Sequence, residues 1–171
     1  VTMGTDGAVT PTGTSDITYT NSTADSTTGL VTTTVTVTDQ KNSFSLKKTD
    51  GTNALEGSHF QITGIFANAS SSATKEFLIG TETGAINTLT GELVAGRSYT
   101  VSEVTPPDGY KKTNDFTATV SADGRTLTLS AVSGGTMPAG VGLDTEKTTI
   151  TAVDYQTAVR VLKQNADGKV T

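Results

Sequence analysis

The 171-residue chain has no cysteine and no tryptophan, and its one histidine is His59. Without cysteine there are no disulfides, no thiolate metal sites and no cysteine nucleophile. A single histidine gives little basis for a histidine metal site or a Ser-His-Asp triad. His59 precedes Phe60 in a strand-like segment, where an ordinary structural histidine is the simplest interpretation. We therefore expect no metal, no cofactor and no enzyme with turnover.

Positive charge and long apolar runs are also scarce. Twelve Lys and Arg residues oppose 17 Asp and Glu residues, so no basic patch is available to neutralise nucleic-acid phosphates. No apolar run is long enough to span a bilayer. The chain opens without a signal-peptide pattern, and we expect residue 1 to be a cut within a longer or already processed protein. Aromatic residues make up only 5% of the chain, so burial alone would give modest stability.

What the chain does contain is Thr, Ser, Gly and Val in short strand-like runs. Turn signals such as Asp50-Gly51 and Pro107-Asp108-Gly109 separate these runs. No segment shows a 3.6-residue apolar period, and the best helix candidate is a short turn over residues 66–75. Many short strands with frequent turns predict an all-β sandwich or barrel. The predicted strands are 31–39, 42–48, 59–66, 75–80, 85–90, 98–104, 115–121, 125–132, 148–155 and 159–164.

The two ends of the chain carry an internal repeat. The segment VTVTDQKNSFSLKKTDG (35–51) resembles ITAVDYQTAVRVLKQNADG (150–168). In both segments an Asp precedes a Lys by nine positions (48 − 39 and 163 − 154). Each segment is interpreted as a last strand, a short linker and the first strand of a new domain, which implies a tandem array. The alternative is that Thr- and Val-rich strands resemble each other by chance.

The tandem interpretation divides the chain into three parts. Residues 41–157 form one complete domain, and residues 1–40 are the β-rich tail of a preceding domain or an N-terminal extension. Residues 158–171 are a linker and the first strand of a following domain. Asp39 and Lys163 would then serve neighbouring domains, and we expect both to be unlinked in this chain.

Three ionisable residues extend apolar rows on separate predicted strands. Because every second residue of a strand shares a face, each row ends in a charged side chain that points the same way as its apolar neighbours. Lys47 lies on the opposite face from Lys48, with Ser43 and Ser45, and is expected in solvent. The three rows are Phe44-Leu46-Lys48, Tyr99-Val101-Glu103 and Ile150-Ala152-Asp154.

These side chains have the chemistry to form an amide if they meet in a dry core. Burial favours a neutral amine and protonated carboxyl groups, which are the forms that the reaction needs. The amine of Lys48 can attack the side-chain carbonyl of Asp154 while Glu103 polarises that carbonyl and shuttles the proton. Fixed proximity supplies effective molarities of roughly 10⁵ M or more. Two alternatives stay open, namely an unreacted buried ion network and a solvent-facing position for one of the residues.

Two segments resemble the CnaB family, the collagen-adhesin B-type or SpaA-type pilin domains. In FSLKKTDGTNALEGSHFQI the matching motif is K-x-D, which begins at Lys48. In YTVSEVTPPDGY the more specific motif is E-x-x-x-P-x-G-Y, which runs from Glu103 to Tyr110. The resemblance covers about residues 41–157 and implies an inverse immunoglobulin-like (CnaB) β-sandwich. It also implies an autocatalytic Lys–Asp isopeptide bond assisted by Glu.

The sequence departs from the family pattern in two places. Glu56 stands where the family usually has a small residue. The stretch 130–147 before the last strand is long and Gly-rich, so Asp144 is a second candidate acceptor beside Asp154.

The resemblance implies a structural stalk or pilus module of a Gram-positive surface adhesin or pilin. Such a module is extracellular, in a cell-wall-anchored surface protein or pilus, and its partners are neighbouring domains or pilus subunits. The bond forms once per molecule, so the module is not an enzyme. The alternative is an adhesin domain that binds a host matrix protein or glycan through the loops at 67–75 and 130–147.

Overall fold

The computed structural model describes residues 2–3, 5, 9–10, 17–80 and 85–169, and the chain divides into two compact units, Val1–Lys41 and Asn42–Thr171. Among the described residues of the first unit, short strands form two antiparallel pairs. Val35 and Val37, in the last of these strands, are exposed. The pairs are β1 (Thr2–Met3) with β2 (Val9–Thr10), and β3 (Ile17–Asn21) with β4 (Thr33–Val37).

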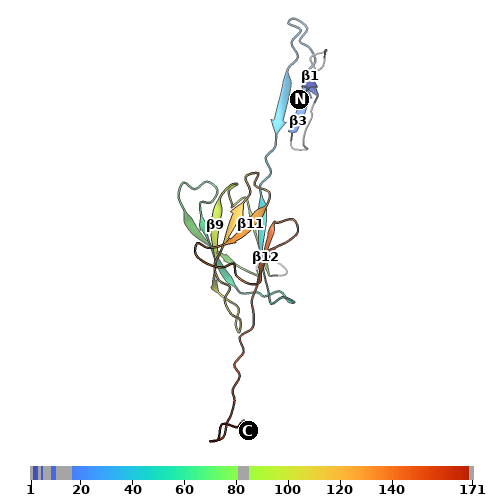
Figure 1. Ribbon diagram of the computed structural model, residues 1–171. Helices are drawn as coiled ribbons and strands as arrows, with labels where there is room; N and C mark the ends of the chain where they lie inside the picture. Colours follow the sequence, from blue (N-terminus) through green and yellow to red (C-terminus); the bar gives the residue numbers. More distant parts are fainter. Residues whose placement is uncertain (1, 4, 6–8, 11–16, 81–84, 170–171) are drawn as a thin grey trace. The chain divides into compact units, whose positions relative to one another are not determined.

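The second unit is a sandwich of two sheets (Figure 1). Five strands form one sheet in the order β11-β10-β9-β6-β7, and four form the other in the order β12-β13-β5-β8. This architecture confirms the predicted all-β sandwich. The strands are β5 (Ser43–Thr49), β6 (His59–Gly64), β7 (Ala73–Leu78), β8 (Ile86–Thr90), β9 (Ser98–Thr105), β10 (Phe116–Val120), β11 (Leu127–Ala131), β12 (Val141–Leu143) and β13 (Thr149–Val153).

The core lies between the two sheets and is built from alternate strand residues. In β5, β9 and β10 every second side chain is buried, as period-2 alternation requires. Gly64 at the end of β6 lets the Tyr99 ring pack against its backbone, because a Cβ there would lie 2.4 Å from a ring carbon. The large core side chains are Phe44, Leu46, Phe60, Ile62, Phe66, Ile79, Leu89, Leu93, Tyr99, Phe116, Leu127 and Ile150.

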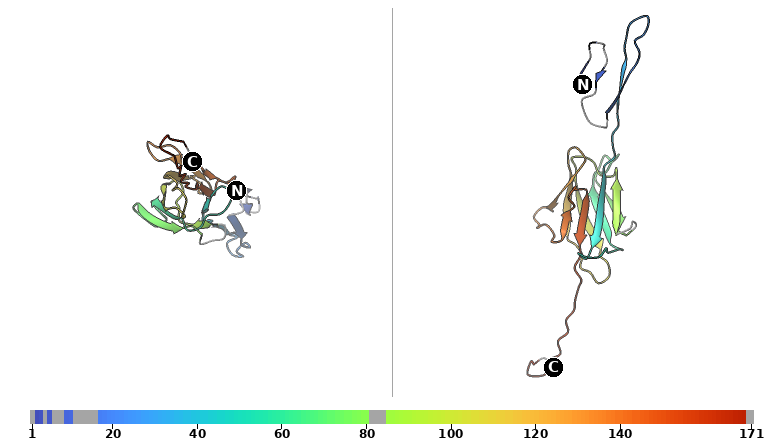
Figure 2. Two further views of the ribbon diagram at one scale, coloured as in Figure 1. Left: turned by 90° about the horizontal axis from the view of Figure 1, so that it is seen from below. Right: turned by 90° about the vertical axis from the view of Figure 1, so that its right-hand side faces the viewer.

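The first and last strands of the sandwich are neighbours. β5 and β13 pair in parallel, with Leu46 opposite Ile150 and Lys48 opposite Ala152. Figure 2 shows β5 in cyan beside β13 in orange-red in its right-hand view. The position after Ala152 on the same face belongs to Asp154, so this pairing brings the two ends of the sandwich together beside Lys48.

The structure corrects three details of the predicted strand pattern. The helical turn over 66–75 is wrong, because this stretch turns at Ala67–Asn68 and then enters β7, which pairs with β6. The strand predicted at 159–164 is absent, since none of the described strands pairs with it, and Val159 and Val161 are 91% and 85% exposed. A short strand, β12, lies within the Gly-rich stretch 130–147 and pairs with β13.

Candidate functional site

The side chain of Lys48 enters the core from the small sheet. Phe44 and Leu46 precede it on the same face of β5, and all three side chains are buried. Directly afterwards the chain turns outward, where the Thr49 hydroxyl accepts a hydrogen bond from the Gly51 N–H at 3.0 Å. The lysine is thus held at the inner end of an apolar row, as its spacing predicts.

The two carboxylates reach Lys48 from different sheets. Glu103 projects from β9 of the large sheet, where it pairs with Phe60 of β6. Asp154 follows β13 in the small sheet, and its backbone N–H donates to the Thr49 carbonyl at 2.9 Å. Because the site spans both sheets, it forms only when the sandwich closes.

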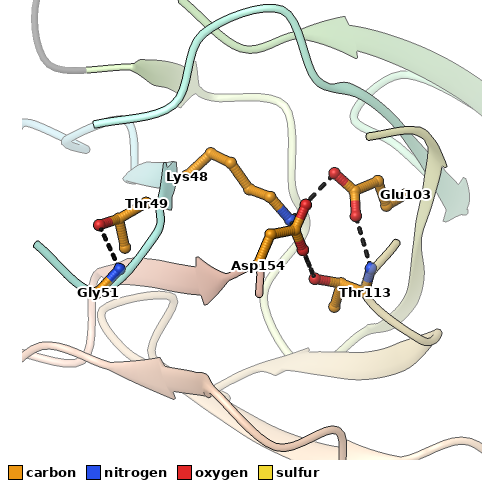
Figure 3. A network of polar contacts seen from close by, with 6 residues as sticks. All are labelled: Lys48, Thr49, Gly51, Glu103, Thr113 and Asp154. Atoms are coloured by element: carbon orange, nitrogen blue, oxygen red, sulfur yellow. Dashed lines mark hydrogen bonds and ion pairs between the residues drawn. The ribbon is translucent and has the colours of Figure 1, made fainter. Parts of the chain in front are cut away.

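The structure brings Lys48, Glu103 and Asp154 together, as Figure 3 shows. Lys48 Nζ lies 2.6 Å from Asp154 Oδ1 and 3.0 Å from Glu103 Oε1. The three residues are 0%, 1% and 1% exposed. Lys48 Nζ also lies 5.2 Å from the centre of the Phe60 ring. An amine and a carboxyl carbon are therefore held adjacent in a space from which solvent is excluded.

A fourth polar residue, Thr113, belongs to the same network but was not predicted. Its hydroxyl accepts a hydrogen bond from Lys48 Nζ at 3.0 Å and donates one to Asp154 Oδ1 at 2.8 Å. Its backbone N–H donates to Glu103 Oε2 at 2.6 Å. Thr113 lies in the loop between β9 and β10, where strand alternation gives no signal, so sequence reasoning had no basis for choosing it.

The network leaves part of its hydrogen-bonding capacity unused. Within the described part of the chain, Glu103 Oε1 and Asp154 Oδ2 are buried atoms with no hydrogen-bond partner, although Glu103 Oε1 faces the lysine. Burying an ion pair is costly unless its remaining lone pairs are satisfied. Replacing the two charges of Lys48 and Asp154 by a neutral amide would relieve that cost.

The second candidate acceptor, Asp144, has a different role in the structure. Its carboxylate accepts hydrogen bonds from the backbone N–H groups of Thr148 and Thr149 at 2.8 and 3.0 Å. The hydrogen bond from Thr149 is the largest influence on the pKa of Asp144, which lies below its usual value. Asp144 thus closes the turn that leads into β13.

The other residues singled out in the sequence lie at or near the surface. His59 opens β6 and is exposed, and Lys47 is half-buried on the outer face of β5. Asp39 and Lys163 are both exposed. Across residues 17–80 and 85–169, together with the described N-terminal positions, no group of three His, Cys, Asp or Glu residues could hold a metal ion. No helix among those residues is long and apolar enough to cross a membrane.

The fold and the site together define a two-sheet, prealbumin-like sandwich with a lysine and two carboxylates buried in its core. The sequence profile of the SpaA family, described as a prealbumin-like fold domain, matches residues 42–134, which is more than half of the chain. The chain belongs to this family, and the match confirms the resemblance inferred from its motifs.

Solved structures support the fold. The C-terminal fragment of the pilus adhesin SpaC from Lactobacillus rhamnosus GG matches with a TM-score of 0.52 and 18% identity, over 86% of this chain and 61% of that one. SpaC in an open conformation matches with a TM-score of 0.51 and 22% identity, over 83% of this chain and 18% of that one. This chain therefore spans less than two thirds of either protein. The comparison with curated proteins gives no match.

Proposed function

We propose that this chain is a structural module of a bacterial pilus or surface adhesin, locked by an intramolecular isopeptide bond between Lys48 and Asp154. The observation that carries the proposal is the burial of the amine 2.6 Å from one carboxylate and 3.0 Å from another. A lysine so enclosed has no route to a substrate from outside, so the chemistry available to it is with its neighbours. The bond forms once, so the module is not an enzyme with turnover.

The reaction needs a nucleophile, an electrophile and a group that handles protons. Lys48 Nζ attacks Cγ of Asp154, and one water leaves as the amide forms. Glu103 Oε1 lies within hydrogen-bonding distance of the attacking nitrogen, which is the position of a general acid–base. The rigid sandwich supplies the proximity, which contributes effective molarities of about 10⁵ M or more.

The bond would join the first and last strands of the sandwich. It closes a loop of 106 residues between Lys48 and Asp154. If the chain-entropy treatment of disulfides carries over, closing a loop of about 100 residues stabilises by about 4.7 kcal/mol. That is a large share of the roughly 5–15 kcal/mol by which a domain is usually stable. Such stabilisation suits a module exposed to tension and proteases outside the cell.

We also propose that the ends of the chain belong to neighbouring modules of a tandem array. The hairpin β3–β4 ends in Val35, Val37 and Asp39, in the same spacing as Ile150, Ala152 and Asp154 of β13. Its two valines are exposed, whereas Ile150 and Ala152 are buried against β5. The hairpin therefore has the sequence pattern of the last strand of a sandwich, but its valines are not packed in a core. Residues 158–171 have the sequence pattern of a first strand.

Intact-protein mass spectrometry tests the bond. The wild-type chain is expected to weigh one water less than its sequence mass. Lys48→Ala and Glu103→Ala are expected at full mass, the first because it lacks the amine and the second because it lacks the proton shuttle. A wild-type chain of full mass would remove the bond from the proposal.

A ligand-binding adhesin is the second candidate, and one surface feature favours it. A cleft of about 440 Å³ lies over the outer face of the large sheet, lined by hydroxyl groups together with Arg97. Ser72, from the loop at 67–75, is among the lining residues. SpaC, which shares the fold, is a pilus adhesin. Binding of the chain to immobilised matrix proteins or glycans, lost in Arg97→Ala, would support this function, and no binding would count against it.

A further inference from the structure

Thr113 is the residue of the buried network that touches both reacting partners. Its hydroxyl lies 3.0 Å from Lys48 Nζ and 2.8 Å from Asp154 Oδ1. Glu103, by comparison, contacts the amine and the backbone N–H of Thr113. The geometry points to the Thr113 hydroxyl as a proton relay between the attacking amine and the departing oxygen. This inference rests on the proposed Lys48–Asp154 bond.

The loop that carries Thr113 is held by two backbone hydrogen bonds to the segment that follows Asp154. The backbone N–H of Lys111 donates to the Tyr155 carbonyl at 2.9 Å, and that of Thr157 donates to the Gly109 carbonyl at 2.9 Å. Gly109 adopts a positive φ of 82°, which favours glycine, at the turn before Tyr110. The loop is thus tied to the residues that directly follow Asp154. When the last strand docks, it aligns the acceptor and Thr113 in one step.

The proton balance of the condensation shows why a relay is useful. Starting from an ammonium and a carboxylate, the loss of one proton from Nζ gives the neutral amine that attacks. The Nζ–Cγ bond then forms and the Cγ–Oδ1 bond breaks. Two protons leave Nζ, and both end on the departing oxygen as water. Glu103 Oε1 faces Nζ and can carry one of them. Thr113 can carry the other, accepting a proton from Nζ while its own hydroxyl proton passes to Asp154 Oδ1, so that the threonine ends unchanged.

A small cleft adjoins Thr113 and Asp154. It has a volume of about 140 Å³, and its walls include Lys112, Thr113, Pro138, Asp154 and Tyr155. A water occupies roughly 30 Å³ in the liquid, so the cleft is large enough to take up the water that the reaction releases. By the same route, a water can reach the space left by a shortened residue 113.

Three substitutions separate a relay from a packing role. Thr113→Ser keeps the hydroxyl, Thr113→Val keeps the volume without the hydroxyl, and Thr113→Ala opens a space that a water can enter. Each full-length chain is prepared unfolded and unlinked by chemical synthesis and dissolved in denaturant. Dilution of the denaturant starts folding, and the intact mass, measured over time, gives the rate at which the unlinked form loses one water. Circular dichroism over the same period establishes that each variant has folded.

If Thr113 is a relay, the rate of amide formation should be highest in Thr113→Ser, lower in Thr113→Ala and lowest in Thr113→Val. Proton transfer by a positioned group contributes about 10²–10⁴-fold, so Thr113→Val should link at least roughly 10²-fold more slowly than wild type. Thr113→Ser should remain near the wild-type rate, and Thr113→Ala should exceed Thr113→Val because a water replaces the hydroxyl.

Either of two results would overturn the inference. A Thr113→Val chain that links at the wild-type rate, or faster than Thr113→Ala, means that residue 113 fills space and relays nothing. If the wild-type chain itself never loses water, the bond and the relay fall together. The wild-type mass thus distinguishes failure of the proposed function from failure of the relay alone.

Discussion

Lys48 occupies a position that an apolar side chain fills in most protein cores. Its Nζ is enclosed by Asp154, Glu103, Thr113 and the Phe60 ring. Removing one partner of a buried ion pair typically costs 3–5 kcal/mol, because the other charge is then left uncompensated. Before any bond forms, the network therefore depends on all its members, and so variants at this site need a check of folding as well as of mass.

The side chain that forms the proposed amide with Lys48 can be identified by the small molecule that the reaction releases. With Asp154→Asn, the same attack by Lys48 would release ammonia instead of water, so the expected mass deficit changes from one water to one ammonia. With Asp144→Asn, the deficit stays at one water, since Asp144 holds the turn before β13 by bonding to Thr148 and Thr149. High-resolution mass spectrometry of the intact variants distinguishes the two losses. The opposite pattern would make Asp144 the acceptor.

Strand alternation was enough to predict three of the four residues in the site, but not Thr113. Lys48, Glu103 and Asp154 each follow two apolar positions at a spacing of two, so their faces were predictable from the sequence. Thr113 lies in a loop, and its contacts depend on how that loop is tied to residues 155–157. No periodicity encodes such a contact, which arises only in the tertiary fold.

Among the strands, the sequence predicted the long alternating ones and missed those defined by their neighbours. β5, β9 and β10 show a clear period of two. β12 has three residues within a Gly-rich stretch and exists because β13 lies beside it. Residues 159–164 have the pattern of a strand but pair with none of the described strands, so Val159 and Val161 stay exposed. A segment with the sequence pattern of a strand therefore does not form one where it has no partner strand to pair with.

Grafting tests whether residues 158–164 can act as a first strand. In the full chain, SFSLKKT (43–49) is replaced by AVRVLKQ, which keeps a lysine at position 48. We expect this chain to fold and to lose one water, because the two valines take the inward positions of Phe44 and Leu46. Intact mass is the measurement.

Two variants serve as controls for the graft. TAVRVLK at the same positions shifts the register by one residue and turns the lysine to the other face, so it should stay at full mass. A Phe44→Val/Leu46→Val double variant measures the cost of the lost core volume by itself. An in-register graft that links no better than the shifted one, while the double variant still links, would exclude residues 158–164 as a first strand.

At the scale of the whole sandwich, the position of the proposed bond determines which residues carry tension. The chain enters through β5, and Lys48 lies near the end of that strand, while Asp154 follows the final strand, β13. Force applied at the two ends of the unit would pass along β5, across the amide and out at residue 155. Residues 49–153 would be bypassed, so the hydrogen bonds that they make with one another would not be loaded.

Single-molecule pulling can test this force path, because the extension of the chain on unfolding shows whether residues 49–153 are stretched. Stretching the 106-residue loop would release roughly 350 Å of chain at about 3.3–3.6 Å per residue. We expect the wild-type unit to show no such extension and Glu103→Ala to show it in full. Trypsin digestion should differ in the same direction, because open states of an unlinked unit are cleaved. A wild-type unit that extends by the full length would contradict the force path.

The distance along the chain between Lys48 and Asp154 would also set the timing of the proposed reaction. The acceptor belongs to the last strand and the amine to the first, so neither meets the other until the whole unit has emerged and closed. If the chain is exported, as a module of a pilus or surface adhesin would be, it stays unbranched until it folds and can pass through a narrow translocation channel. The proposed Lys48–Asp154 amide would make the chain branched only after folding, when no further channel has to be crossed.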